Sequence, residues 1–238
     1  MPSTITEIQD GAFGQCRNLI FPNLPEGLGV IRHGMFFQCQ SLTSLRVPST
    51  VAEIEIERMA LQECASLLSV KIPKEIERIE HRTFRGCIAL VNIALPSTIN
   101  DIEGIVFRGC DKLQQLFPDH DDLLNALKHR FDDLPIHGLC YYHSYHTTAE
   151  IMENLQQLQL MKEDATTGER GDAFGMTPFH ILTLSAKPNL AHLFQELLDA
   201  YPTDLLDRKD KRPLDLTSRS QQHHSCLVKL YSFKKRVD

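Results

Sequence analysis

Apolar residues recur along the first half of the chain at a nearly constant step. Each repeat carries a phenylalanine or leucine, a cysteine three residues later, and a leucine three residues after the cysteine. The cysteines of this series are Cys16, Cys39, Cys64, Cys87 and Cys110. Successive cysteines lie 23, 25, 23 and 23 residues apart. Such a period is typical of solenoid proteins, because one repeat cannot bury its apolar side until a neighbour stacks on it. The pattern predicts a five-coil solenoid over residues 1–117.

Within each repeat, the stretch after the cysteine alternates between apolar and polar residues, as in LTSLRVP (42–48) and LLSVKIP (67–73). A period of two indicates a β-strand that buries one face. A proline ends each strand, because proline has no N–H to donate to the ladder. The predicted inward positions are Leu45, Val47, Val70, Ile72, Ile93 and Leu95.

The residues between these apolar positions are predicted to form one solvent-facing surface. Because packing does not require their side chains, we expect this surface to contact a protein partner. The predicted contact residues are Ser44, Arg46, Ser69, Lys71, Asn92 and Gln115.

The third repeat is two residues longer than its neighbours. Its extra residues lie in AEIEIERMALQEC (52–64), where Ile56 in place of Ile54 keeps the usual spacing to Leu61 and Cys64. We expect the insertion to lie in a loop.

The full repeat, I-x4-F-x2-C-x2-L-x2-[LIV]-x-[LIV]-P-x5-I, resembles the BspA-like class of leucine-rich repeats. The resemblance covers about half of the chain. It implies an α/β solenoid with a parallel sheet on one face. This class serves many unrelated binding roles, so the fold alone does not fix the function.

After Pro118 the apolar spacing becomes helical, beginning with DHDDLLNALKHRFDDLP (119–135). We expect residues 118–133 to form a helix that caps the solenoid. The acidic residues Asp119, Asp121 and Asp122 could hold a hard cation, but the segment lacks the glycine and glutamate of an EF-hand loop. Acidic residues at a helix N-terminus are favoured by the helix dipole, which is the interpretation we adopt.

Residues 134–238 contain three segments with a shared signature: LPIHGLCYY (134–142), TPFHILTLS (177–185) and RPLDLTSRS (212–220). The middle segment, with DAFGMTPFH (172–180), resembles the opening of an ankyrin repeat. The resemblance implies an all-α helical stack over 134–238, with structural hydrogen-bonding roles for His137 and His180. Pro178 is well suited to open a helix, and Thr177 to satisfy its free amides.

Composition narrows the class of partner. The formal net charge is −6 and the pI is about 6.0, so we expect neither nucleic acid nor an anionic membrane as the main partner. No apolar run reaches the roughly 18 residues needed to span a bilayer, and the start of the sequence lacks the features of a secretory signal. We therefore expect a location in the cytosol or nucleus. The sequence begins at a repeat boundary without a polar cap, so we expect further repeats or a partner to cover that end.

The seven cysteines are read as free thiols. Neighbouring coils lie about 4.8 Å apart, close enough for a disulfide, but equivalent side chains run parallel to one another. Buried cysteine commonly behaves as a small hydrophobic residue, and a reducing compartment keeps thiols free.

One cluster suggests chemistry: His137, Cys140, His143 and His146 have spacings that place ligands on one helical face. No second ligand pair accompanies them, and no cofactor motif is present. The leading hypothesis is a non-enzymatic protein-binding scaffold that uses the solenoid face and the helical stack. The alternative is a zinc- or thiol-dependent enzyme centred on residues 137–146.

Overall fold

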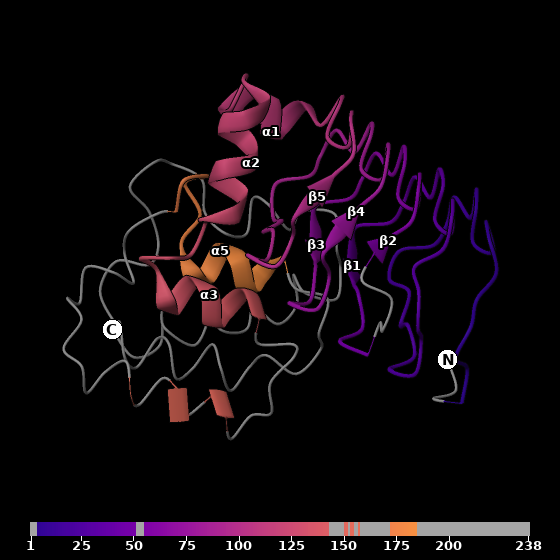
Figure 1. The fold of residues 1–238 in the computed structure, drawn as a ribbon, viewed down its shortest axis with the longest axis horizontal. Helices are drawn as coiled ribbons and strands as arrows, with labels where there is room; N and C mark the ends of the chain where they lie inside the picture. Colours follow the sequence, from indigo (N-terminus) through magenta and orange to yellow (C-terminus); the bar gives the residue numbers. More distant parts are fainter. Residues whose placement is uncertain are drawn as a thin grey trace, which may run out of the picture. The chain divides into compact units, whose positions relative to one another are not determined.

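The computed structural model of the chain describes residues 4–50, 55–142 and 172–184, together with residues 150, 151, 153, 154 and 157. It divides into two compact units, Met1–Arg130 and Phe131–Asp238. In the first unit the chain winds through stacked coils that follow one another from the N-terminus to helix α1 (Figure 1). We number the coils by their opening prolines. Coil 1 precedes Pro25, and coils 2 to 5 begin at Pro25, Pro48, Pro73 and Pro96.

One side of the coils forms a short parallel sheet at the predicted place. Strand β1 (Ser44–Arg46) pairs with β3 (Ser69–Lys71), and Leu45 lies opposite Val70. An isolated parallel bridge from Ser69 to Asn92 continues the ladder into coil 4. All six predicted inward side chains are at most 2% exposed, so the prediction of which residues point into the core is confirmed.

A second parallel sheet, which the alternation did not predict, follows another side of the coils. Its strands are β2 (Glu55–Ile56), β4 (Arg78–Ile79) and β5 (Asp101–Ile102), in that order. Ile56 pairs with Ile79 and bridges to Ile31 in coil 2. The register confirms that Ile56 takes the repeat position in the longer third coil.

A third side of each coil is joined to the next coil by backbone hydrogen bonds. The amide of Leu61 donates to the carbonyl of Thr83 over 3.1 Å, and the equivalent bond recurs from coil to coil. The residue before each cysteine adopts a left-handed backbone, with φ of 61° at Glu63 and 76° at Gly86. We call this side the turn face; it comprises residues 32–39, 57–64, 80–87 and 103–110.

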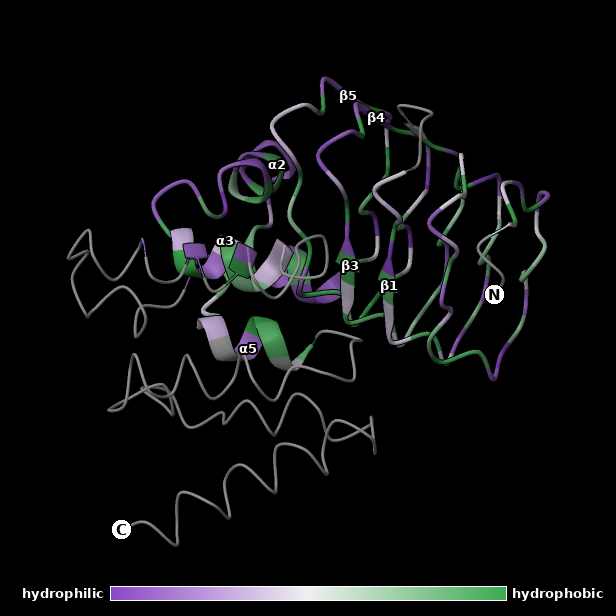
Figure 2. Ribbon diagram, turned by 90° about the horizontal axis from the view of Figure 1, so that it is seen from below, coloured by the Kyte–Doolittle hydropathy of each residue, from purple (hydrophilic) through white to green (hydrophobic). Residues whose placement is uncertain are grey.

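The core between these three sides is aliphatic and aromatic. Phe13 stacks on Phe36 with ring centroids 5.3 Å apart, and Phe84 stacks on Phe107 at 5.5 Å. Leu61 holds the same repeat position in coil 3 and separates the two stacked pairs. Hydrophobic and hydrophilic segments alternate along every coil, as expected when each coil contributes only a few side chains to a thin core (Figure 2).

Helices α1 (Asp111–Leu116) and α2 (His120–Lys128) end the solenoid. The carboxylate of Asp119 caps α2, because its Oδ1 accepts hydrogen bonds from the amides of Asp121 and Asp122 at 2.9 and 3.0 Å. This geometry confirms the helix-terminus role predicted for the acidic residues. Leu123 and Leu127 bury the inner side of α2.

Leu127 in α2 and Arg130 just after it cover the edge of the first sheet at coil 4; we call α1, α2 and Arg130 the cap. The amide of Leu95 donates to the carbonyl of Leu127 over 3.0 Å. Nη1 of the buried Arg130 donates to the carbonyl of Ile93 over 2.6 Å. The cap therefore supplies partners that another strand would otherwise provide.

In the second unit, α3 (Pro135–Tyr142) packs against α5 (Pro178–Thr183). The hydroxyl of Thr177 accepts from the amide of His180, whose Nδ1 accepts in turn from the amide of Thr177 over 3.2 Å. The predicted roles of Thr177 and Pro178 at a helix start are thus confirmed. None of the helices in the described part of the chain has the length and apolar content to cross a lipid bilayer.

Candidate interaction surface

The surface predicted from the alternation is mostly buried. Four of its six residues are at most 6% exposed, so the prediction that all six share one exposed face is wrong. The four buried residues are Ser44, Ser69, Lys71 and Asn92.

The reason lies in how small polar side chains fill the space between coils. Ser44 and Ser69 occupy equivalent positions in β1 and β3, and Asn92 lies next to Ser69 across the bridge. Nδ2 of Asn92 donates to Oγ of Ser69 over 3.0 Å. A polar group that bonds to a neighbouring coil in this way can lie away from water, whereas the alternation rule assumes a solvated face. Oδ1 of Asn92 is buried without a hydrogen-bond partner among the described residues.

Arg46 and Gln115 remain accessible, but in different settings. Arg46 is partly exposed on β1 and forms an ion pair with Glu26 of coil 2. Gln115 is exposed on α1, so its predicted position on the strand surface is wrong. The helix replaces the strand because the fifth repeat is cut short. Partner contact at Arg46 and Gln115 stays a prediction.

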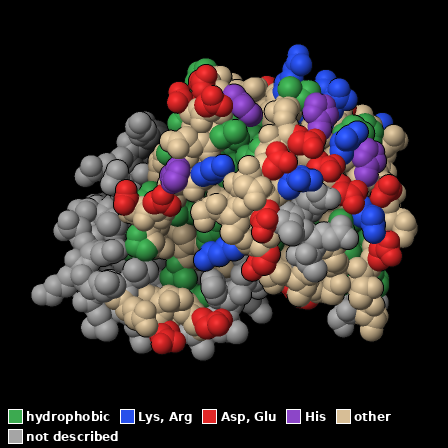
Figure 3. Space-filling view, viewed as in Figure 1, with side chains coloured by type: hydrophobic (Ala, Val, Ile, Leu, Met, Phe, Trp, Pro, Cys, Tyr) green, Lys and Arg blue, Asp and Glu red, His purple; other side chains and the backbone are tan. Residues whose placement is uncertain are grey.

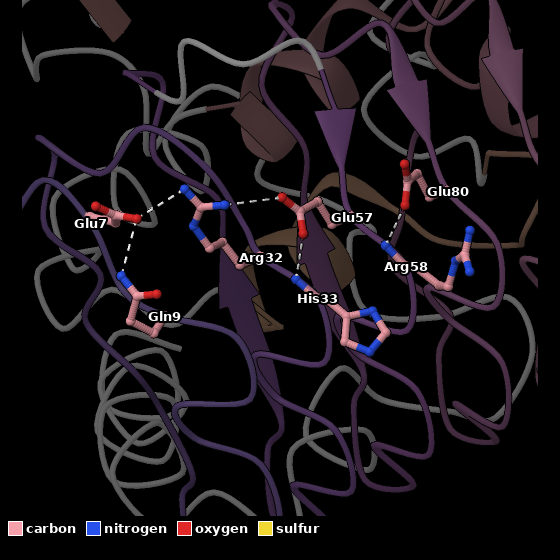
Figure 4. A network of polar contacts seen from close by, with 7 residues as sticks. All are labelled: Glu7, Gln9, Arg32, His33, Glu57, Arg58 and Glu80. Carbon is pink, nitrogen blue, oxygen red and sulfur yellow. Dashed lines mark hydrogen bonds and ion pairs between the residues drawn. The ribbon is translucent and has the colours of Figure 1, made fainter.

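A row of glutamates that the sequence reading missed runs along the turn face. In three consecutive coils a glutamate carboxylate accepts a hydrogen bond from a backbone amide of the coil before. The pairs are Glu57 with the His33 amide at 2.8 Å, Glu80 with Arg58 at 2.9 Å, and Glu103 with His81 at 3.2 Å. Figure 4 shows the first two of these contacts side by side. The signal was available, because these glutamates recur 23 residues apart.

In coil 2 the same position carries a cation instead. Arg32 lies between two carboxylates, with Nη2 at 3.0 Å from Glu7 and Nη1 at 3.6 Å from Glu57 (Figure 4). Glu7 also accepts a hydrogen bond from Gln9. The glutamate row is therefore continued by a charge bridge across coils 1 to 3. Each carboxylate of the row accepts a hydrogen bond or pairs with a cation from a neighbouring coil, so these glutamates join the coils to one another.

The buried cysteines Cys39, Cys64, Cys87 and Cys110, which we call the cysteine ladder, also join neighbouring coils. Each buried thiol donates a hydrogen bond to a backbone carbonyl in the coil before it. These bonds join Cys39 to Phe13, Cys64 to Phe36, Cys87 to Leu61 and Cys110 to Phe84, at 2.9, 3.1, 3.2 and 3.1 Å. The carbonyl belongs to the residue at the phenylalanine position, so the two most regular features of the repeat bind each other.

Burial also makes these thiols poor nucleophiles. Loss of solvation raises the pKa of the Cys39 thiol to about 11 and that of Cys64 to about 12. It raises the pKa of Cys110 to about 12 as well. Since the thiolate is the reactive form, the ladder offers no activated cysteine. Cys16, in coil 1, is exposed.

The predicted histidine and cysteine cluster is only partly described by the structure. His137 and Cys140 are buried on α3, whereas His143 and His146 lie outside the described residues, as does all of 185–238. Within the described ranges, no group of three or more His, Cys, Asp or Glu side chains is placed to hold a metal ion. The alternative of a zinc- or thiol-dependent enzyme gains no support from the part that can be seen.

Comparison with known proteins agrees with the repeat pattern. The family model described as "BspA type Leucine rich repeat region" matches residues 54–125, with six copies. A solved structure of a leucine-rich repeat protein from Bacteroides ovatus is also similar, at 30% identity. That match covers 38% of this chain and 25% of the other, with a TM-score of 0.36. No curated protein matches the chain. The family-model match supports the leucine-rich-repeat fold predicted for the first half of the chain, and residues 54–125 are similar to the BspA type.

Proposed function

We propose that the chain is a non-enzymatic scaffold that binds another protein through its repeat solenoid. The observation that carries the proposal is the register of the coils. Strands, turns and thiol bonds repeat in step, so side chains at equivalent positions are held about 4.8 Å apart along a rigid edge. An extended, regularly spaced surface is what solenoids offer to protein partners.

Charged side chains of both signs cover the visible edge of the solenoid (Figure 3). Interspersed charges of this kind give specificity for a complementary protein surface, since they penalise wrong partners more than they add affinity. Arg46 and Gln115 keep their place in the proposed surface, whereas the four buried residues leave it. The exposed positions of the turn face take their place.

We extend the proposal to the second unit, where ankyrin-like helices would present a further surface. Oδ1 of Asp172 accepts hydrogen bonds from the amides of Phe174 and Met176, both at 2.9 Å, just before the Thr177 cap of α5. A carboxylate-stabilised turn followed by a Thr-Pro helix start fits the ankyrin-like opening expected from DAFGMTPFH. We place the scaffold in a reducing compartment, because four thiols of the solenoid are buried as hydrogen-bond donors and are not cross-linked.

The proposal is tested by affinity capture followed by reconstitution. The tagged chain is used to capture proteins from extracts of its native cells, and a captured protein is then purified and titrated against the chain by calorimetry. We expect a saturable complex with a Kd in the micromolar range or tighter, as for specific interfaces of standard size. A matched control chain carries Leu45→Asp, which places a charge in the core and unfolds the coils.

Two results would count against the scaffold. One is capture of the same proteins by the Leu45→Asp control, which would show that folded coils are not needed. The other is a catalytic turnover that survives in the chain but disappears when His137 and Cys140 are both replaced by Ala, which would favour the enzyme hypothesis.

A further inference from the structure

Four cations on coils 4 and 5 and the start of α1 have no carboxylate partner among the described residues. They are Arg82, Arg85, Arg108 and Lys112, which we call the basic patch. In the described part of the chain, none of their side chains takes part in an ion pair or a hydrogen bond. The arginines Arg32, Arg46 and Arg78, in contrast, each lie against a carboxylate. The patch therefore has charge to offer to another molecule.

Backbone contacts bring these residues together. The amide of Arg85 donates to the carbonyl of Arg82 over 3.1 Å within one turn. In the next coil, the carbonyl of Arg108 accepts from the amide of Gly86 over 2.9 Å, and Arg85 and Arg108 occupy equivalent repeat positions. Equivalent positions in neighbouring coils lie about 4.8 Å apart, so the side chains of Arg85 and Arg108 are attached to adjacent backbone segments.

Apolar surface lies beside the cations. Ile88 is 47% exposed, although it follows directly after the buried Cys87. The amide of Lys112 donates to the carbonyl of Ile88 over 3.4 Å, which places the backbones of these two residues side by side. Figure 3 shows Lys or Arg side chains beside hydrophobic ones over the upper ends of the coils near α1. A large exposed aliphatic side chain in the same coil as Arg82 and Arg85 is unlike a simple solvated edge, which is polar.

Of the neighbouring acids, Glu63, Glu80 and Glu103 are held by hydrogen bonds and form no ion pair with the patch, whereas Asp111 is exposed beside Lys112. Glu80 and Glu103 accept backbone amide hydrogen bonds on the strand side of the turn face. Glu63 accepts from Gln38 and Gln62 at 2.7 and 3.0 Å, and these bonds lower its pKa, with a smaller contribution from the charge of Arg85. Carboxylates held in this way leave the nearby arginines for an outside partner.

We propose that the basic patch binds an acidic segment of a partner protein, with an apolar side chain of that segment packed against Ile88. This inference rests on the proposed scaffold function and names the kind of partner. Arginine is among the residues that most often contribute binding energy at protein interfaces, and the buried centre of an interface is more apolar than its rim. Nucleic acid fits less well, because it requires an extended field of positive charge, and here glutamates alternate with the cations in a chain of net charge −6.

The test uses a fluorescein-labelled ten-residue peptide in which glutamates flank one central leucine, titrated with the full chain by fluorescence anisotropy. We expect Arg108→Glu to weaken binding about tenfold and Arg85→Glu/Arg108→Glu to weaken it further. The matched control is Arg17→Glu, the same charge reversal at an exposed arginine of coil 1, for which we expect less than a twofold change. Ile88→Asp should also weaken binding, and raised salt should weaken the wild type more than the double variant.

All substituted side chains are exposed or partly exposed, so we expect every variant to fold. Circular dichroism and the thermal midpoint of each variant check this. Equal affinity of wild type and Arg108→Glu would overturn the proposal. So would tighter binding of a ten-nucleotide single-stranded RNA than of the peptide. If a partner captured as described above binds the double variant as well as it binds the wild type, the basic patch is wrong while the scaffold function stands.

Discussion

Nη1 of Arg130 lies 2.6 Å from the carbonyl oxygen of Ile93, where the first parallel sheet would otherwise need another strand. Arg130 and Ile93 are both buried, at 3% and 0% exposed, so the guanidinium supplies a hydrogen bond to a carbonyl that is shielded from water. Replacing Arg130 by Met leaves the carbonyl without this donor. We expect the free energy of unfolding to fall by about 1–3 kcal/mol, measured by urea denaturation of the full chain.

The control for this cap is Lys128→Met, the same loss of charge near the end of α2. Lys128 is partly exposed, so we expect a change below about 0.5 kcal/mol. Equal destabilisation by the two substitutions would show that the cap acts only through the charge of the helix terminus.

The thiols should fall into fast and slow classes in the native protein. Cys16 is exposed, whereas burial raises the pKa of Cys39, Cys64, Cys87 and Cys110. We expect Cys16→Ser to remove one thiol equivalent from the rapid phase of reaction with a chromogenic disulfide at pH 8. Cys64→Ser should leave the amplitude of that phase unchanged, and loss of rapid amplitude in this variant would contradict the model of a protected ladder.

Stability should fall at alkaline pH. Burial raises the pKa of Cys64 in the folded chain from 9.0 to about 12, so the folded state favours the protonated thiol. Its stabilising contribution is complete below pH 9 and is lost as the pH rises towards 12. Over that window a single such thiol lowers the free energy of unfolding by about 1.4 kcal/mol per pH unit. Urea denaturation at pH 8, 9 and 10 under reducing conditions measures the slope, which should be shallower in Cys64→Ala.

The phenylalanine row should show a gradient of energetic importance. Phe84 is fully buried and stacked on Phe107, while Phe13 is only partly buried in coil 1. We expect Phe84→Ala to cost about 3–5 kcal/mol and Phe13→Ala clearly less, because the transfer and cavity costs scale with burial. Urea denaturation of both variants makes the comparison at one repeat position. Equal costs would mean that the end coil is as well packed as the middle of the solenoid.

The cap of α5 can be tested without disturbing the solenoid. Thr177→Val keeps the shape of the side chain but removes the oxygen that accepts from the amide of His180. We expect a loss of about 1 kcal/mol in local stability, seen as roughly fivefold faster hydrogen exchange at that amide. Thr177→Ser retains the hydroxyl and should exchange within twofold of the wild type; matching acceleration in both variants would exclude a role for the hydroxyl.

The buried positions of the solenoid could be predicted because they follow directly from periodicity. Leu45 and Val70 alternate with polar residues, and this spacing places the apolar side chains on one face of a strand, which is the face that is buried. The cap could also be anticipated, because Asp119 begins a segment with helical spacing. Each of these predictions depends on residues close together in the sequence.

The outer surface was harder to predict, because exposure depends on neighbours in other coils. Ser69 occupies an outward strand position, yet its hydroxyl meets Asn92 from the next coil. The second sheet could not be predicted from alternation, because β4 and β5 have only two residues each. The 23-residue spacing of Arg85 and Arg108 is present in the sequence, but the exposure of Ile88 in the same region is known only from the structure.

The direction of the thiol hydrogen bonds has a consequence for how such a chain can change length. Each buried cysteine donates to the coil before it, and turn-face amides such as that of Leu61 donate to the coil after it, so an internal coil forms equivalent hydrogen bonds with both neighbours. Removing or duplicating the segment from Pro73 to Leu95 would bring equivalent hydrogen-bond donors and acceptors together at the new junction. Loss or gain of a few residues within the turn face would place a thiol opposite the wrong carbonyl, whereas the two extra residues of coil 3 lie before its turn face and Cys64 still bonds to Phe36. We therefore expect changes in length to be tolerated as whole coils of 23 residues or between turn faces, and to be penalised within a turn face.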